Sequence, residues 1–115
     1  MSDQARTHIA GMGASPGKAT GTVHLVRETS LLSGVSRDAI LVTRILHPHL
    51  APLMARVAGI VVEEGSLLQH ATTLAREFGV PAVVGVAGAV TLFHEGDVIE
   101  VNGDTGEIVR REPVT

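Results

Sequence analysis

The sequence predicts an α/β domain in which short buried strands alternate with amphipathic helices. Residues 59–86, GIVVEEGSLLQHATTLAREFGVPAVVGV, form the first indication, because two β-branched runs flank a stretch with helical spacing. Residues 39–43, AILVT, read as a fully buried strand, and residues 22–27 alternate as a half-buried strand. A glycine-containing turn near residue 104 predicts a closing hairpin. Predicted strands outnumber predicted helices.

Composition limits the classes of protein to which this chain can belong. Its 115 residues are enough for one domain, and the presence of only two phenylalanines as aromatic residues predicts an aliphatic core. The net charge of −3 without a basic cluster argues against nucleic-acid binding. The lack of cysteine excludes disulfides and thiol catalysis and suits the cytoplasm. No apolar run approaches the roughly 18 residues of a membrane span, and no signal-peptide pattern is present.

The central unit is predicted to place one histidine at the start of a helix. Residues 59–62 read as a buried strand, and Glu63–Gly65 interrupts it. Ser66 and Gln69 have the S-x-x-Q spacing of a capping box, in which each side chain bonds the other residue's backbone N–H. His70 therefore falls in the first helical turn, beside amides that have no partner within the helix.

The rest of the helix shows one apolar stripe and a clear end. The stripe consists of Leu67, Ala71, Leu74, Ala75 and Phe78. His70, Thr73 and Glu77 follow its edge. Gly79 is typical of a helix C-cap and Pro81 prevents continuation, so residues 82–84 are predicted as the next buried strand.

Upstream, a glycine-rich segment leads into the first predicted strand. Residues 11–21 invite comparison with a nucleotide-binding loop, but Lys18 is followed by Ala19 instead of Ser or Thr, and the first glycine is misplaced. A nucleotide-binding loop is therefore not expected in this segment. In the strand over residues 22–27, we expect His24 to be exposed.

The remaining segments have simpler predictions. Residues 28–38 form a polar connection, and residues 50–57 a short helix with Leu50, Leu53, Met54 and Val57 turned inward. The pair His47 and His49 lacks a third ligand and is separated by proline, so no metal site is predicted. Residues 97–101 and 107–110 are predicted as strands joined by the turn at 102–106.

The position of His70 suits chemistry with phosphate. A helix N-terminus carries positive partial charge and outward N–H groups, which stabilise anions. The same field favours the neutral imidazole, whose lone pair is a nucleophile. The plainer interpretation is a histidine that only packs at the edge of the helix.

The motif around His70 resembles the phosphohistidine swivelling, or mobile, domain of phosphoenolpyruvate-utilising enzymes. The family pattern is approximately T-[DE]-x-G-G-x-x-[STC]-H-x-x-x-x-A-R-E-x-G-[IV]-P-A-V-V-G, and this chain matches it closely from His70 to Gly85. Residues 11–21 match the family's opening G-x-x-A-S-P-G-x-A-x-G, which implies a structural turn leading into the first strand. The closing segment also matches, so the resemblance covers nearly the whole chain. It implies a compact β/β/α swivelling domain over residues 9–111, with flexible tails at 1–8 and 112–115.

The resemblance also implies a function. Such domains belong to enzymes such as phosphoenolpyruvate synthase, pyruvate phosphate dikinase and enzyme I, where they carry phosphate between active sites. His70 is then phosphorylated transiently, and the residues expected near the phosphate are Gly65, Ser66, Gln69 and Thr73. We expect no cofactor or metal on this chain. Nucleotide-binding and phosphoenolpyruvate- or pyruvate-binding partner domains, with Mg²⁺ and ATP or phosphoenolpyruvate, are implied to complete the phosphotransferase.

Three positions depart from the family pattern. Val62 replaces threonine, Ser66 replaces the second glycine, and Gln69 replaces a small hydroxyl or thiol residue before the histidine. These departures motivate an alternative, a catalytically silent interaction or regulatory module that keeps the fold. We expect either a free-standing carrier or an excised domain, and the initial methionine and the lack of a linker slightly favour the free-standing carrier.

Overall fold

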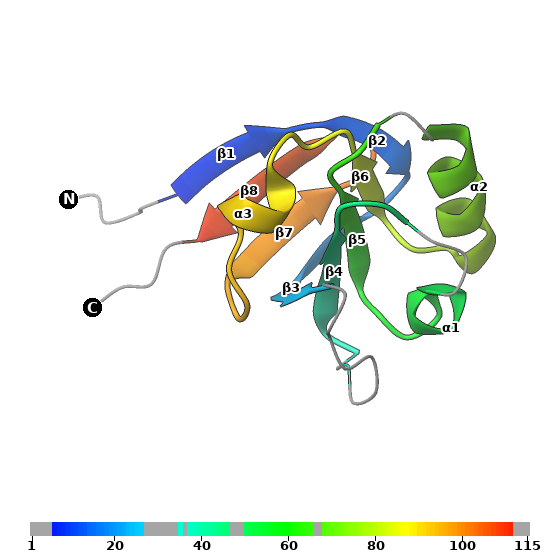
Figure 1. Cartoon of the computed structure of the whole chain (residues 1–115), viewed down its shortest axis with the longest axis horizontal. Coiled ribbons are helices and arrows are strands. Elements are labelled where there is room, and N and C mark those ends of the chain that lie inside the picture. The colour runs from blue at the N-terminus through cyan, green and yellow to red at the C-terminus, as the bar shows by residue number, and fades with distance from the viewer. Residues whose placement is uncertain (1–5, 27–34, 36, 47–49, 66–67, 112–115) are drawn as a thin grey trace.

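The computed structural model describes residues 6–26, 35, 37–46, 50–65 and 68–111. Within these residues one mixed sheet has the strand order β1-β8-β7-β3-β4-β5-β6-β2 (Figure 1). The strands are β1 (Arg6–Ala10), β2 (Met12–Ser15), β3 (Lys18–Leu25), β4 (Ala39–Thr43), β5 (Gly59–Val62), β6 (Ala82–Val84), β7 (Val98–Asn102) and β8 (Glu107–Arg111). The helices are α1 (Ala51–Met54), α2 (Leu68–Phe78) and α3 (Ala89–Leu92).

The centre of the sheet is parallel. β3, β4, β5 and β6 run in the same direction, with Leu41 opposite Ile60 and Val61 opposite Val83. Every residue of β4 and β5 is buried, because both faces of these strands are covered. This burial explains why both strands carry almost no polar residue, and the strands predicted at 39–43, 59–62 and 82–84 are confirmed.

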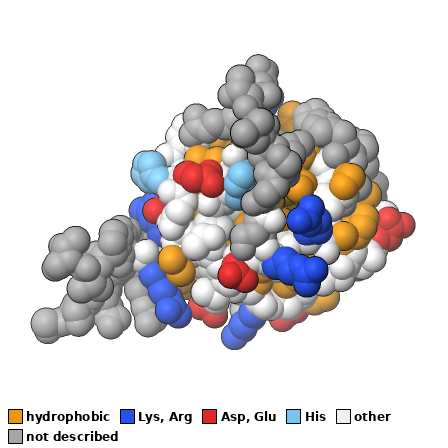
Figure 2. All heavy atoms as spheres, turned by 90° about the horizontal axis from the view of Figure 1, so that it is seen from below, with side chains coloured by type: hydrophobic (Ala, Val, Ile, Leu, Met, Phe, Trp, Pro, Cys, Tyr) orange, Lys and Arg blue, Asp and Glu red, His pale blue; other side chains and the backbone are white. Residues whose placement is uncertain are grey.

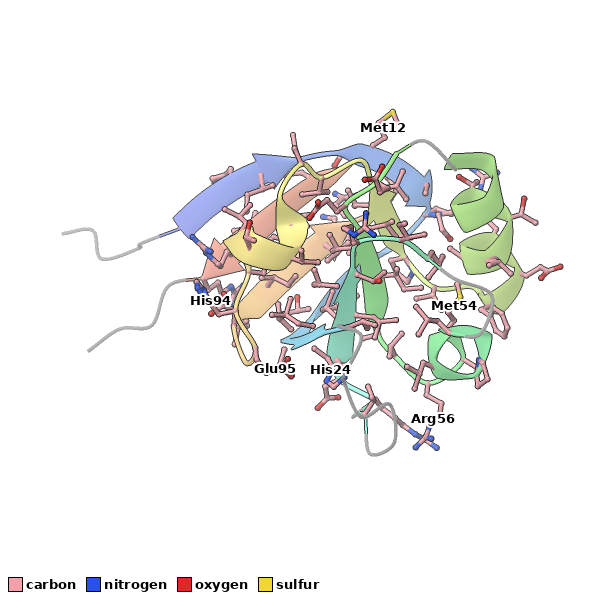
Figure 3. The ribbon with its side chains drawn as sticks, in the orientation of Figure 1. Met12, His24, Met54, Arg56, His94 and Glu95 are labelled. Carbon is pink, nitrogen blue, oxygen red and sulfur yellow. The ribbon has the colours of Figure 1, made fainter. Side chains whose placement is uncertain are left out.

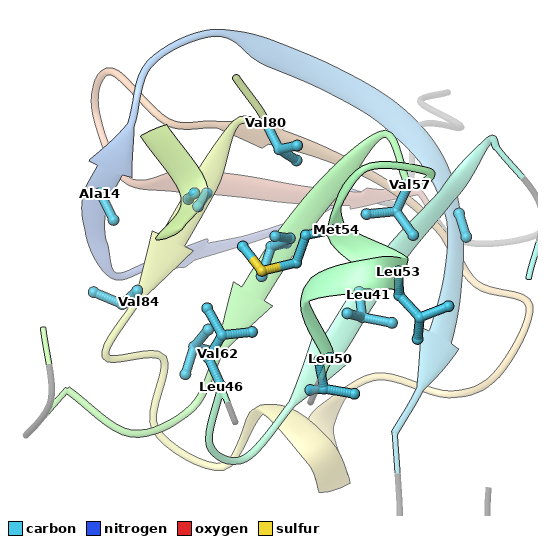
Figure 4. Packing of buried hydrophobic residues seen from close by; sticks show 14 of the residues in the cluster. Ala14, Leu41, Leu46, Leu50, Leu53, Met54, Val57, Val62, Val80 and Val84 are labelled. Atoms are coloured by element: carbon cyan, nitrogen blue, oxygen red, sulfur yellow. The ribbon is translucent and has the colours of Figure 1, made fainter. Parts of the chain in front are cut away.

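Two apolar cores lie against the sheet, one on each face. Leu41 belongs to the core that includes residues of α1 and α2, whereas its neighbours Ile40 and Val42 belong to the core that includes Ala89 of α3. Adjacent residues of a strand point to opposite faces, so the helices cover the sheet from two sides. Figure 4 shows the first core, in which the four predicted inward residues of the 50–57 segment are all buried. The helix itself is shorter than predicted, spanning Ala51–Met54.

The first two strands connect the two ends of the sheet. β1 pairs with β8 and β2 pairs with β6, yet only Gly11 separates them in sequence (Figure 1). The backbone N–H of Gly11 donates to the carbonyl oxygen of Gly106 at 2.8 Å. A Cβ at Gly11 would lie 2.7 Å from the carbonyl oxygen of Val84, so glycine is required where the chain crosses.

This arrangement corrects two predictions. The 11–21 segment is not only a turn, because it supplies β2 and the first residues of β3; its glycines also allow close backbone approach. Residues 6–8, expected within a flexible tail, belong to β1, where His8 pairs with Val109. Backbone pairing in a ladder does not require apolar side chains, so the polar N-terminal sequence did not reveal this strand.

Two further differences concern helices. α3 was not predicted, because its four residues are too few to show a helical period. Phe78, expected on the apolar stripe of α2, is 39% exposed, whereas Ala75 is fully buried. Phe78 is the last residue of the helix and adjoins the turn at Gly79, so it projects beyond the buried stripe. The chain is thus a sheet-dominated domain with few, short helices.

The closing hairpin agrees with its prediction. β7 and β8 are antiparallel, and Asn102 organises the turn by accepting hydrogen bonds at Oδ1 from the backbone N–H groups of Asp104 (2.9 Å) and Thr105 (3.2 Å). On the face shown in Figure 2, basic, acidic and apolar side chains are interspersed. None of the helices in the described part of the chain is long and apolar enough to cross a membrane.

Candidate functional site

His70 lies in the first turn of α2, the position predicted for it. α2 begins at Leu68, so His70 is its third residue. The side chains of Gln69 and His70 lie outside what the structure describes, as does all of Ser66, and the proposed capping box therefore stays a prediction. Among the other expected phosphate neighbours, Gly65 ends the described part of the β5–α2 loop and Thr73 is exposed on α2.

Backbone hydrogen bonds anchor the loop that leads from β5 towards His70. The N–H of Glu63 donates to the carbonyl oxygen of Thr43, and the N–H of Glu64 donates to that of Arg44, each at 2.9 Å. On the other side, the N–H of Val86 donates to the carbonyl oxygen of Val62 at 3.2 Å. The start of the loop is therefore held between the ends of β4 and β6.

The side chain of Glu63 extends this anchoring, whereas that of Glu64 lies in an exposed ion pair. Glu63 accepts a hydrogen bond at Oε1 from the backbone N–H of Val90 in α3 at 3.1 Å. Glu64 instead faces Arg44, with 3.8 Å between Oε2 and Nη1. Gly65 passes close to Gly85, whose Cα would lie 3.4 Å from a Cβ at position 65. The carboxyl ends of neighbouring parallel strands thus meet at the loop that precedes His70.

The C-terminal half of α2 is fixed by capping and by a contact with β2. The N–H of Gly79 donates to the carbonyl oxygen of Arg76 (3.2 Å), and that of Val80 donates to Ala75 (3.0 Å). With Gly79 at φ +67°, these bonds form a Schellman motif, which confirms the predicted C-cap. Arg76 also donates from Nε to the carbonyl oxygen of Ala14 at 3.2 Å.

The side chain of Val62 lies in the apolar core and not at the surface. Its side chain is 2% exposed and packs in the core that contains Leu46 and Val84 (Figure 4). In this chain, the position of the family's threonine therefore offers no hydroxyl group to a ligand. The valine side chain instead contributes apolar contacts to this core.

The expectation that His24 is exposed is wrong, because its side chain is half-buried. Its side chain is 22% exposed, and Nδ1 lies 3.2 Å from Oε2 of Glu95, whose Oε1 accepts from the backbone N–H of Leu25 at 2.8 Å. The turn that follows α3 folds against the end of β3, a tertiary contact that strand alternation does not reveal. Figure 3 shows this pair far from the start of α2, so it is separate from the His70 region.

Two other features do not add to the site. A hollow lined by Ser15, Pro16, Arg76 and Gly79 lies at the C-terminal end of α2, the opposite end from His70. Within the described ranges, no three His, Cys, Asp or Glu side chains gather as a metal site. His47 and His49 fall outside those ranges.

Comparisons with known proteins identify relatives. Residues 35–106 match the family model described as PEP-utilising enzyme, mobile domain. A probable phosphoenolpyruvate synthase from Methanothermobacter thermautotrophicus is 39% identical over 98 residues, which cover 85% of this chain and 14% of that protein. This chain therefore spans about one seventh of the length of that relative.

Two solved structures share the fold. Thermococcus kodakaraensis aconitase X in its holo-form has a TM-score of 0.67 and 25% identity, over 92% of this chain and 99% of that chain. An enzyme I protein (nEIt) in solution has a TM-score of 0.60 and 28% identity, over 72% of this chain and 34% of that chain.

Proposed function

We propose that this chain, which belongs to the family of PEP-utilising enzyme mobile domains, is a phosphoryl carrier that uses His70. The observation that carries the proposal is the place of His70 within the stretch matched by the family, in the first turn of the helix that follows β5. The anchored loop before it supports the proposal, because phosphoryl transfer depends mainly on positioning and charge stabilisation. In this function the domain swivels as a β/β/α unit between two partner sites.

The proposed step is a simple displacement at phosphorus. The lone pair of one unprotonated imidazole nitrogen of His70 attacks the phosphorus of the donor, forming a P–N bond. The bond from phosphorus to the donor's bridging oxygen breaks, and its electron pair leaves with that oxygen. In the second transfer, an acceptor oxygen attacks the phosphorus and the P–N bond returns its pair to the ring.

The residues around the start of α2 are proposed to hold the phosphoryl group. Unpaired amides of a first helical turn attract anions. Gly65, Ser66, Gln69 and Thr73 are the proposed neighbours of the group. Gly65 keeps the loop narrow where it passes Gly85, and the exposure of Thr73 leaves its hydroxyl accessible to an incoming donor.

The donor and acceptor are proposed to bind elsewhere. A chain that spans 14% of a phosphoenolpyruvate synthase relative leaves most of such a protein to other domains or subunits. We place nucleotide binding, phosphoenolpyruvate or pyruvate binding and the required Mg²⁺ on those partners, in the cytoplasm. The carrier alone then accepts and donates phosphate without turnover of its own.

The test is direct phosphorylation of the intact chain. The protein is incubated with Mg²⁺, ATP or phosphoenolpyruvate, and a phosphoenolpyruvate synthase whose own phosphoryl-accepting histidine has been replaced. We expect an acid-labile, base-stable mass increase of about 80 Da, one phosphoryl group. His70→Ala abolishes it, and His94→Ala, at an exposed histidine in the turn after α3, retains it. Labelling of His70→Ala would refute the carrier function.

A second candidate is a silent module that keeps the fold without phosphoryl transfer. It is favoured by the buried Val62 in place of threonine and by the occurrence of the same fold in aconitase X. This candidate predicts no adduct with either donor, while the folded chain still binds a partner subunit in a pull-down from purified components. An adduct on His70 would eliminate it.

A further inference from the structure

Glu63 connects the loop before the His70 helix with α3. It is the first residue after β5, and its Oε1 accepts from the backbone N–H of Val90 at 3.1 Å. Val90 is the second residue of α3, where backbone N–H groups lack partners within the helix. The N-cap position of α3 is Gly88, which provides no side-chain hydrogen bond. Glu63 therefore supplies from a distant part of the chain the capping acceptor that α3 lacks locally.

The backbone of Glu63 is fixed as firmly as its side chain. Its N–H donates to the carbonyl oxygen of Thr43 at the end of β4. One residue is thus bound to β4 through its amide and to α3 through its carboxylate, 27 residues away in sequence. Because Glu63 precedes His70 by seven residues, these two contacts restrict the path by which the chain reaches the first turn of α2.

Glu64 offers a matched control. It is the next residue and carries the same charge, but its carboxylate faces Arg44 at 3.8 Å with 42% of its side chain exposed. Such exposed ion pairs contribute little to rigidity, because solvent screens them. A change at Glu64 therefore removes a carboxylate from the same loop without breaking the contact with α3.

We infer that Glu63 is a positioning residue for phosphoryl transfer, acting by holding the β5–α2 loop against α3 so that His70 meets its donor in one geometry. The inference rests on the proposed carrier function for its kinetic consequence. The hydrogen bond between Glu63 and Val90 does not depend on that function. No chemical step is assigned to Glu63 itself.

The kinetic test compares Glu63→Ala, Glu63→Gln and Glu64→Ala. Circular dichroism first shows that each variant is folded. The initial rate of phosphorylation by the same phosphoenolpyruvate synthase is then measured at a series of carrier concentrations. Misplacing a reacting group lowers the rate more than the binding, so Glu63→Ala should reduce kcat about tenfold or more with little change in KM. Glu63→Gln should keep most of the activity, because its amide oxygen still accepts from Val90. Glu64→Ala should match the wild type.

Two kinetic outcomes overturn the inference. One is an unchanged kcat in Glu63→Ala. The other is a kcat for Glu63→Gln as low as that for Glu63→Ala, which would assign the effect to charge and not to the hydrogen bond.

Amide hydrogen exchange tests the contact without phosphorylation. In the unmodified protein, Glu63→Ala should raise the exchange rates of the Val90 and Glu64 amides by about fivefold or more, since lost contacts permit local opening. The Ile60 amide, which donates within the sheet to Pro81, is the internal control and should not change. If neither the wild type nor any variant is phosphorylated, the carrier function fails, while hydrogen exchange still decides whether Glu63 holds the loop against α3. Unchanged exchange at Val90 and Glu64 overturns the inference.

Discussion

Arg76 on α2 donates a hydrogen bond from Nε to the carbonyl oxygen of Ala14 on β2, with 3.2 Å between the two atoms. The bond spans 62 residues of sequence and ties the helix that begins near His70 to the strand that pairs with β6. From sequence, Arg76 and Glu77 form a charged pair on the helix surface without an assignable role. The structure gives Arg76 a part in seating α2 on the sheet.

Arg76→Ala is expected to lower the free energy of unfolding by about 1 kcal/mol, the usual net value of one hydrogen bond. The neighbouring Glu77→Ala is the control, because Glu77 is an exposed residue on the same helix. Chemical denaturation followed by circular dichroism measures both. Equal stability of the two variants would show that the bond to Ala14 contributes nothing.

Gly103→Ala is expected to destabilise the domain by roughly 3 kcal/mol or more, because a side chain there must displace packed backbone. A Cβ at this position would overlap the carbonyl oxygen of Ser15. The backbone N–H of Gly103 also donates to the carbonyl oxygen of Gly17 at 2.8 Å, which fixes the backbone in place. Thermal and urea unfolding provide the measurement. A variant as stable as the wild type would mean that β2 and the closing hairpin separate at little cost.

Gly79→Ala is expected to cost only about 1 kcal/mol, since it disturbs conformation and not packing. Gly79 has φ +67°, but no described atom lies within 4 Å of the Cβ that alanine would add. The comparison with Gly103→Ala separates backbone conformation from steric overlap, using the same substitution. If the cost at Gly79 reached that at Gly103, the Schellman end of α2 would be more important than its exposed position suggests.

Gln69→Ser should accelerate phosphorylation of His70 if the longer glutamine side chain crowds the approaching donor. Serine restores the small hydroxyl residue of the family pattern immediately before the histidine. The rate is measured with the same synthase and donor as for the wild type, and Thr72→Ser on the same helix serves as a control for a nearby change. A slower rate in Gln69→Ser would instead give Gln69 an active part in transfer.

Ser66→Ala tests the predicted capping box, which lies outside the described residues. Loss of an N-cap hydroxyl should reduce stability by about 1 kcal/mol. The mutation is compared with wild type by thermal unfolding. An unchanged midpoint would place the cap of α2 elsewhere.

Patterns that depend on near neighbours were predictable, and pairings between distant segments were not. The runs at 39–43, 59–62 and 82–84 show their burial directly, because a strand covered on both faces carries apolar residues without interruption. The end of α2 was predictable because glycine, here Gly79, is the residue type typical of a helix C-cap. By contrast, the partner of His24 is Glu95, and nothing in the alternation of β3 indicates a carboxylate so far along the chain.

The sequence by itself determined the central strands, the helix that carries His70, the closing hairpin and the family, since each follows from local periodicity or a contiguous motif. Tertiary structure decided that β1 and β2 join opposite ends of the sheet, that Glu63 caps α3 and that Arg76 holds β2. These relationships depend on strand order, which brings together groups that are remote in sequence. A backbone amide looks the same in every residue, so its partner is defined only when the chain has folded.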